Sequence, residues 1–173
     1  KTDDYGASWK KIINGIKPGH YVHAVREDKV RPGLLFAGTE YGVMVSFDDG
    51  ANWQSLQLNL PVTQVPDLVV KDNDLAIATH GRSMYILDNI NPLREFKPEM
   101  AGKSFHMFKP ADAYRRIQNA SVQYYLGRET DSVKIEVLDE GGNLIKSFTG
   151  KKPDSTAKKA DGASDEESYF GPS

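Results

Sequence analysis

Apolar and polar positions alternate in short runs over the first part of the chain, and this pattern predicts β-strands. Between residues 21 and 58, β-branched and aromatic residues gather in four runs separated by Gly, Pro and Asp, at 21–26, 34–39, 43–47 and 53–58. Three further runs follow at 67–71, 75–79 and 84–87, and one at 9–13 would be the last strand of an earlier group. No helical period of 3.6 residues interrupts residues 1–90, so we expect an all-β structure there.

A motif of the form S/T-x-D-x-G-x-x-W occurs at residues 2–9 and again at 46–53. Its aspartates, Asp4 and Asp48, lie 48 − 4 = 44 residues apart. A weaker third copy contains Asp88 but has Ile86 and Ile90 where the motif requires Ser/Thr and Gly. A period of about 40–45 residues with four short strands is typical of a β-propeller blade. The fold class that we expect is therefore a partial propeller of about two four-stranded blades.

The chemistry of the motif favours a structural role. An Asp side chain in a tight turn accepts hydrogen bonds from backbone N–H groups, and Gly supplies a positive φ. The Trp then enters the next strand and buries its ring between blades. A metal-binding or catalytic Asp is the weaker alternative, because such a site would not need the Trp. We assign this structural role to Thr2, Asp4, Gly6, Trp9, Ser46, Asp48, Gly50, Trp53 and Asp88.

The sequence changes character after the propeller-like part, which we place at residues 1–93. Residues 94–110 form a connector in this interpretation, and 111–150 contain expected strands at 122–126, 133–138 and 144–148, with a turn signal at 139–143 between the last two. We interpret 111–150 as strands of an immunoglobulin-like β-sandwich. Residues 151–167 lack any apolar side chain larger than Ala and predict a disordered loop, after which 168–173 would begin a further strand.

Composition excludes several classes of function. A net charge of −2 supplies no basic surface for a phosphate backbone, so we expect no nucleic-acid partner. No apolar run approaches the ~18 residues of a membrane span, so this segment is not expected to insert into a membrane. The chain has no Cys, and its four His residues show no zinc-binding spacing. We therefore expect neither a metal nor a cofactor.

The two copies of the motif, at residues 2–9 and 46–53, are called boxes below. They resemble those of the Asp-box family, also called the bacterial neuraminidase repeat, over residues 1–90. This family includes sialidases, xyloglucanase-like glycosidases and the sortilin ectodomain. The string from Leu75 to Asp88 with Pro92-Leu93-Arg94 looks like the last blade of large secreted, sortilin-like bacterial proteins that are often labelled glycosyl hydrolases. In those proteins an immunoglobulin-type sandwich follows the propeller.

The resemblance also implies an extracellular or periplasmic location and six to ten blades. Two blades alone would expose sheet edges and an apolar face. We therefore expect the chain to be a fragment whose partners are upstream blades.

The phase of the strands predicts where a ligand would bind. In a propeller, the turns between the second and third strands share one face with the links between blades, whereas the boxes lie on the opposite face. The expected ligand face carries the turns 40–42 and 80–82 and the links around 17–20 and 61–64. Our candidate ligand-binding residues are Glu40, Tyr41, His80 and Arg82, and aromatic and guanidinium groups make Tyr41 and Arg82 the stronger pair.

No complete catalytic set is present in the sequence. A glycosidase needs two catalytic carboxylates about 5–10 Å apart. Glu40 is a candidate for one of them, and the sequence indicates no candidate for the other. The arginines of the propeller part, Arg26, Arg31 and Arg82, do not form the triad of a sialidase. We expect a scaffold that binds a peptide or protein ligand. The alternatives are a glycoside hydrolase whose catalytic carboxylates lie mostly outside these residues, and a purely structural segment that joins a propeller to a sandwich.

Overall fold

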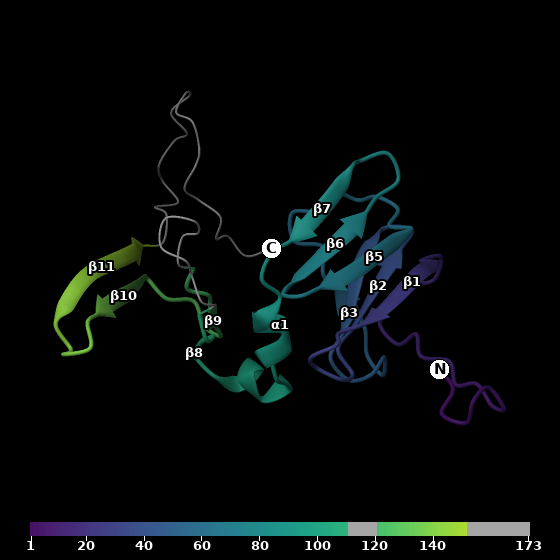
Figure 1. The fold of residues 1–173 in the computed structure, drawn as a ribbon, viewed down its shortest axis with the longest axis horizontal. Coiled ribbons are helices and arrows are strands. Elements are labelled where there is room, and N and C mark those ends of the chain that lie inside the picture. Colours follow the sequence, from purple (N-terminus) through teal and green to yellow (C-terminus); the bar gives the residue numbers. More distant parts are fainter. Residues whose placement is uncertain (111–120, 152–173) are drawn as a thin grey trace. The chain divides into compact units, whose positions relative to one another are not determined.

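The computed structural model describes residues 1–110 and 121–151. These residues are mostly β and form small antiparallel sheets, as expected for an all-β chain (Figure 1). They belong to two compact units, the first spanning Lys1–Gly127 and the second beginning at Arg128. No helix within the described ranges is long and apolar enough to cross a membrane. The expectations for the disordered loop at 151–167 (apart from Lys151) and for a strand at 168–173 lie outside the described residues.

The first sheet contains four antiparallel strands in sequential order, as the spacing predicts. They are β1 (Val22–Glu27), β2 (Leu35–Thr39), β3 (Gly42–Ser46) and β4 (Gln54–Ser55). Every residue of β2 and β3 is buried, which agrees with their almost continuous apolar sequence. The fourth strand is shorter than the 53–58 expected, since only Gln54 and Ser55 pair in register with β3.

The second sheet has three strands, one fewer than a four-stranded blade. They are β5 (Asp67–Lys71), β6 (Asp74–Ala78) and β7 (Met84–Leu87). Buried and exposed positions alternate along β5, so one face of this sheet is covered and the other is open. After β7 the chain turns into the helix α1 (Asn91–Glu95) and the 3-10 helix η1 (Pro98–Gly102), and within the described ranges no strand pairs with the outer edge of β7.

The main core lies between the two sheets. The first sheet contributes Leu34, Phe36, Val43 and Val45, and the second contributes Leu68, Val70, Leu75 and Ile77. Close approach requires Gly38, because a Cβ there would lie 2.5 Å from the carbonyl oxygen of Val65. A smaller cluster on the other face of the first sheet contains Leu35, Ala37, Met44 and Trp53. The two inner strands of the first sheet, β2 and β3, are thus buried on both faces, whereas β5 of the second sheet is buried on one.

The expectation of a strand at 9–13 is wrong. These residues form no strand in the structure, because no neighbouring strand within the described ranges offers them a ladder. The segment instead lies against the end of the first sheet. The backbone N–H of Trp53 donates to the carbonyl of Asn14 (2.8 Å), and the indole Nε1–H of Trp53 donates to the carbonyl of Ile12 (3.0 Å).

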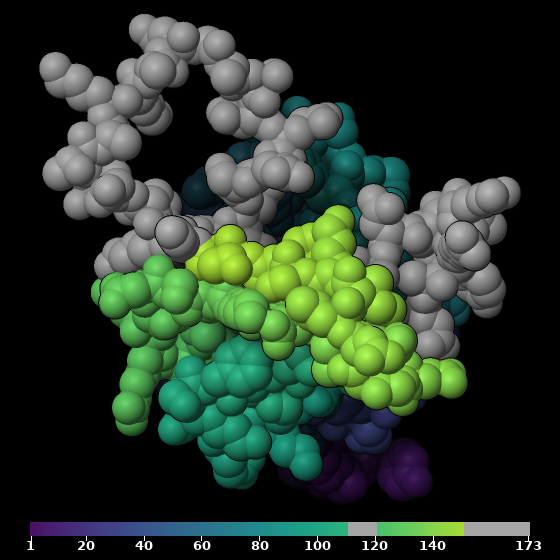
Figure 2. Space-filling view, turned by 90° about the vertical axis from the view of Figure 1, so that its left-hand side faces the viewer, coloured from purple at the N-terminus to yellow at the C-terminus, as the bar shows by residue number. Residues whose placement is uncertain are grey.

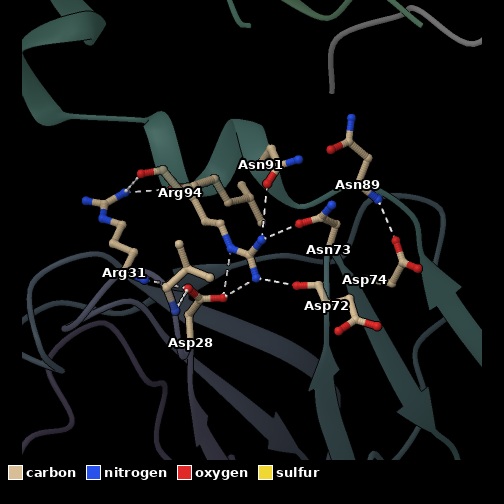
Figure 3. Close-up of polar contacts among 10 residues, drawn as sticks. Asp28, Arg31, Asp72, Asn73, Asp74, Asn89, Asn91 and Arg94 are labelled. Atoms are coloured by element: carbon tan, nitrogen blue, oxygen red, sulfur yellow. Dashed lines mark hydrogen bonds and ion pairs between the residues drawn. The ribbon is translucent and has the colours of Figure 1, made fainter. Parts of the chain in front are cut away.

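Contacts of two partly buried arginines hold α1 against the first sheet (Figure 3). The Asp28 carboxylate, which is fully buried, accepts hydrogen bonds from Nε (3.0 Å) and Nη2 (2.8 Å) of Arg94. Arg31 Nη1 donates to the carbonyls of Leu93 and Phe96, each at 2.6 Å. Burial alone would raise the pKa of Asp28, but the Arg94 guanidinium and the backbone N–H groups of Arg31 and Val30 outweigh it and lower that pKa. The helix that follows the second sheet is therefore tied to the first.

The three strands expected after the connector are present, although β9 and β11 differ from the expected bounds. The strand β9 (Tyr124–Leu126) pairs in the first unit with β8 (Phe105–Met107), a strand that lies within the expected connector and was not predicted. In the second unit, β10 (Ser132–Leu138) pairs with β11 (Leu144–Lys151). At the hairpin turn, Asp139 accepts hydrogen bonds from the backbone (2.8 Å) and side chain (3.0 Å) of Asn143. The hairpin, yellow-green in Figure 2, exposes the apolar side chains of Val137, Leu138, Leu144, Ile145 and Phe148.

Candidate ligand site on the turn face

The two boxes close the same hydrogen-bond network. In the first, the Gly6 N–H donates to Thr2 Oγ1 (2.8 Å), and the Ser8 N–H donates to Asp4 Oδ1 (2.9 Å). In the second, the Gly50 N–H donates to Ser46 Oγ (2.9 Å), and the Asn52 N–H donates to Asp48 Oδ1 (2.8 Å). Each Asp also accepts from the hydroxyl two residues before it. These bonds engage the carboxylates within the turns, which agrees with a structural role.

The hydrogen bonds favour the ionised form of both aspartates. The side chain and backbone of Ser8, followed by Thr2, lower the pKa of Asp4 to about 2. Burial would raise the pKa of Asp48, but the donors of Asn52 and Ser46 outweigh it and leave that pKa below its usual value. A carboxylate held in its ionised form by turn donors is a poor general acid at neutral pH.

The third copy does not close a box. The register pairs Ala37 with Met44 in the first sheet and Ile77 with Tyr85 in the second. The offset between the sheets is therefore 77 − 37 = 40 before the turn and 85 − 44 = 41 after it, because the second turn contains one extra residue. The offset of 41 consequently aligns Asp48 with Asn89, but the positive φ of Asn89 (54°) occurs in the closed boxes one position after the Asp, at Tyr5 (56°) and Asp49 (59°). Asp88 is exposed and makes none of the box hydrogen bonds within the described ranges.

The boxes and the candidate ligand residues lie at opposite ends of the sheets. Strand β2 begins at Leu35, which pairs with the box residue Ser46, and ends at Thr39, which pairs with Gly42. We call the Thr39 end the turn face. It consists of the turns 40–41 and 79–83 and the links 15–20 and 57–65.

A pocket of about 190 Å³ opens on the turn face beside the first sheet. Its walls include Tyr41 and His20, whose rings lie 4.4 Å apart between centroids, together with the cation Lys17. Gln57 lines the pocket beside Gly42 and donates to the carbonyls of Leu60 (2.8 Å) and Pro61 (3.0 Å). The remaining lining is Gly15, Thr39, Gly42, Val43, Met44 and Ser55, so this pocket has aromatic, apolar and cationic walls and no carboxylate among the described residues.

Glu40 lies beside this pocket and is engaged by a neighbour. Its Oε2 lies 2.9 Å from His23 Nε2, which in turn lies 3.2 Å from Gln64 Nε2. The backbone carbonyl of Gln64 accepts from the N–H of His80 (2.9 Å). The two turns of the turn face are thus connected through the link between the sheets, which places Glu40 and His80 on one continuous surface.

Arg82 is exposed, and no hydrogen bond or ion pair engages it within the described ranges. Its turn is closed by Thr79, whose Oγ1 donates to the carbonyl of Ser83 (2.5 Å). Gly81 (φ 78°) and Ser83 (φ 67°) carry positive φ values in this turn. Of the four candidates, the structure brings Tyr41 into the pocket, Glu40 and His80 onto the surrounding surface, and leaves Arg82 at the tip of the second turn.

Sequence reasoning missed Lys17, His20 and Gln57 as individual pocket residues. The sequence predicts that the link around 17–20 shares a face with the turn 40–42, but the ring contact between His20 and Tyr41 depends on the path of a loop that carries no periodic pattern. Within the described ranges, no group of three or more His, Cys, Asp or Glu residues could hold a metal ion.

Comparison of the chain with protein-family models, curated proteins and solved structures gave no significant match. The geometry of the turn face is therefore what indicates a function for this chain.

Proposed function

We propose that this chain is a ligand-binding scaffold of the β-propeller type, which binds a peptide or protein segment on its turn face. In this proposal the first and second sheets are two blades, and the β10–β11 hairpin belongs to an immunoglobulin-like sandwich. Sequential antiparallel strands, face-to-face packing of the sheets and a box between the third and fourth strands all support the blade interpretation.

The observation that carries the proposal is the pocket beside Tyr41. The ring pair of His20 and Tyr41, with Met44 beside it, suits an aliphatic or aromatic ligand side chain, and Lys17 supplies a positive charge. Arg82 adds a second exposed cation on the same face. We therefore infer that the ligand combines an apolar side chain with a neighbouring acidic group.

The glycoside hydrolase alternative receives no support from this pocket. A glycosidase needs two carboxylates that face the same bond, and the described lining contains none. Glu40, the nearest candidate, is held by His23. Binding is thus the better proposal for the turn face, and an extracellular or periplasmic location remains a proposal that depends on the Asp-box resemblance alone.

A peptide panel tests the proposal. Synthetic peptides that pair Leu or Phe with Asp or Glu should bind the protein saturably in calorimetry, and amide-capped peptides without the acid should bind more weakly. Tyr41→Ala combined with Arg82→Ala should weaken binding at least about tenfold and leave the melting temperature nearly unchanged, because both side chains are substantially exposed.

Matched controls lie on the opposite face. Tyr5→Ala and Lys29→Ala remove one aromatic ring and one cation that are also exposed but lie away from the turn face, so peptide affinity should not change. Hydrolysis of aryl glycosides without saturable peptide binding would overturn the proposal.

A further inference from the structure

No strand of the described residues pairs with the outer edge of β7, and no side chain fills the small crevice beside it. In the first sheet a strand and a Trp occupy the equivalent positions. In the first sheet, β3 is followed outward by β4, and Trp53 just before β4 packs against Leu35, Ala37, Met44 and Ile16. In the second sheet β7 is the last strand. Two of its side chains are both apolar and exposed: Met84 is 71% exposed and Ile86 is 62% exposed.

A small crevice on the second sheet corresponds to the site that Trp53 occupies on the first. By the offsets between the sheets, Ala37 is equivalent to Ile77 (37 + 40) and Met44 to Tyr85 (44 + 41). By the 44-residue spacing of the boxes, Ile16 is equivalent to Leu60. All three of these equivalents, Ile77, Tyr85 and Leu60, line the crevice. Leu56, which also lines it, corresponds to Ile12, the residue whose carbonyl accepts the Trp53 indole.

The chain also contains a segment that could fill this edge and crevice. It is the first box with Trp9, whose following residues pair with no strand of the described ranges. Trp9 is 75% exposed, and the residues that follow it form no strand. The offset of 44 makes Ile12 the equivalent of Leu56, whose N–H donates to the carbonyl of Val43 (2.9 Å). Val43 in turn corresponds to Met84 (43 + 41), so the Ile12 N–H would donate to the Met84 carbonyl.

We propose that residues 9–13 of a second copy of this chain add to the outer edge of β7 as its missing fourth strand, with Trp9 inserted into the crevice between Tyr85 and Leu60. Backbone hydrogen bonds to an open edge supply affinity, and the Trp selects the register. Within one copy the segment is held at the far side of the first sheet by Trp53, so the strand comes from another molecule. The contacts between Lys1 and Lys10 occupy the pairing edge of the segment and are displaced.

This interface is head-to-tail, because each copy offers one strand and one open edge. Successive copies therefore form a chain or, where the rotation closes, a ring. Upstream blades of a longer polypeptide would present the same two features; the second copy is the occupant that these residues themselves provide. The proposal concerns the edge of β7 and is independent of ligand binding on the turn face.

Sedimentation velocity of the 173-residue protein over a wide concentration range tests the proposal. The protein should associate in a concentration-dependent way. Trp9→Ala, which removes the inserted ring, and Met84→Asp, which places a charge opposite Ile12, should each weaken association at least about tenfold. Both side chains are exposed, so the circular dichroism melts should match that of the wild type.

Mixing the two variants distinguishes association through this interface from association through another surface. Trp9→Ala retains the open edge and Met84→Asp retains the strand, so an equimolar mixture should form complexes of two chains that do not grow further. Met107→Asp is the matched control for an exposed Met on another sheet and should associate like the wild type.

Three results would overturn the proposal. They are a monomer at every concentration, a Trp9→Ala variant that associates like the wild type, and loss of association on Ile145→Asp. The last would show that the exposed hairpin carries the interface, because Ile145 lies on β11.

Discussion

The two tryptophans of the boxes have the same sequence context and opposite surroundings. Trp53 is 6% exposed and packs against Leu35, Ala37 and Met44, whereas Trp9 is 75% exposed and no sheet of the described residues covers it. The motif therefore specifies a turn and delivers a Trp to the next strand, but burial of the ring depends on which sheet stands beside it. A residue pattern alone does not determine its energetic contribution.

Substitution of the two tryptophans should separate the turn from the packing. Trp53→Ala should lower the free energy of unfolding by about 3–5 kcal/mol, because it leaves a cavity and removes the donor to the Ile12 carbonyl. Trp9→Ala should change it by less than about 0.5 kcal/mol in dilute protein, as expected for an exposed site. Urea denaturation followed by circular dichroism measures both values. Equal losses would show that the box turn, and not the ring, carries the effect.

The box aspartates predict a pH dependence of stability. Because the folded-state pKa of Asp4 is lowered to about 2 and that of Asp48 is also lowered, their stabilising effect is fully present above the unfolded pKa of about 3.9. It should be lost as the pH falls from about 4 toward about 2. Melting temperatures across this range should fall for the wild type.

Asp48→Asn should lower the melting temperature at neutral pH and flatten the profile below about pH 4, since one titrating carboxylate is gone. Asp88→Asn is the matched control: Asp88 makes no box hydrogen bond in the described part of the chain, so its profile should follow the wild type. A large effect of Asp88→Asn would restore the structural role that the sequence assigned to it.

At the scale of elements, the sequence predicted the strands that alternate or are continuously apolar. The bounds of β5 and β7 agree with the expected 67–71 and 84–87. Strand β4 is shorter than expected and 9–13 is not a strand, because pairing requires a neighbour that a local pattern does not contain. The sequence also did not reveal the one-residue insertion in the turn 79–83, because the match of Asp48 with Asp88 at an offset of 40 hides the change of register.

The same limits apply to the candidate site. Strand phase placed Glu40, Tyr41, His80 and Arg82 on the face opposite the boxes, and the registers agree with that placement. The pocket itself depends on a loop contact, the ring pair of His20 and Tyr41, and on Gln57 crossing beside Gly42. Such contacts join segments whose sequences carry no period, so only the folded chain reveals them.

Attachment of α1 to the first sheet predicts a second contrast between variants. Arg94→Ala should lower the free energy of unfolding by about 3 kcal/mol, because it leaves the buried Asp28 carboxylate without its guanidinium partner. Arg26→Ala breaks a similarly short ion pair with Asp67, but both side chains are well exposed, so the loss should stay within about 1 kcal/mol. Chemical denaturation of the two variants measures the difference. Similar losses would mean that Arg94 contributes little beyond a surface pair.

At the scale of the whole molecule, stability should differ between the two units. In the first unit, β2, β3 and β6 contribute to a core shared by two sheets. In the second, β10 and β11 form a two-stranded hairpin whose apolar side chains are largely exposed, and such hairpins are marginally stable. The units should therefore open independently and with different free energies.

Hydrogen exchange followed by mass spectrometry tests this expectation on the intact chain. Peptides that cover β2, β3 and β6 should retain their amide protons longest, because their exchange requires opening of the shared core. Peptides that cover β10 and β11 should exchange orders of magnitude faster, and Phe36→Ala, which destabilises the core, should accelerate exchange in the first unit and leave the hairpin unchanged. Ile145→Ala serves as the reverse control, since it alters only the hairpin. Equal protection of the hairpin and the core would instead show that a further partner surface covers β10 and β11, which would make that hairpin, and not the edge of β7, the interface.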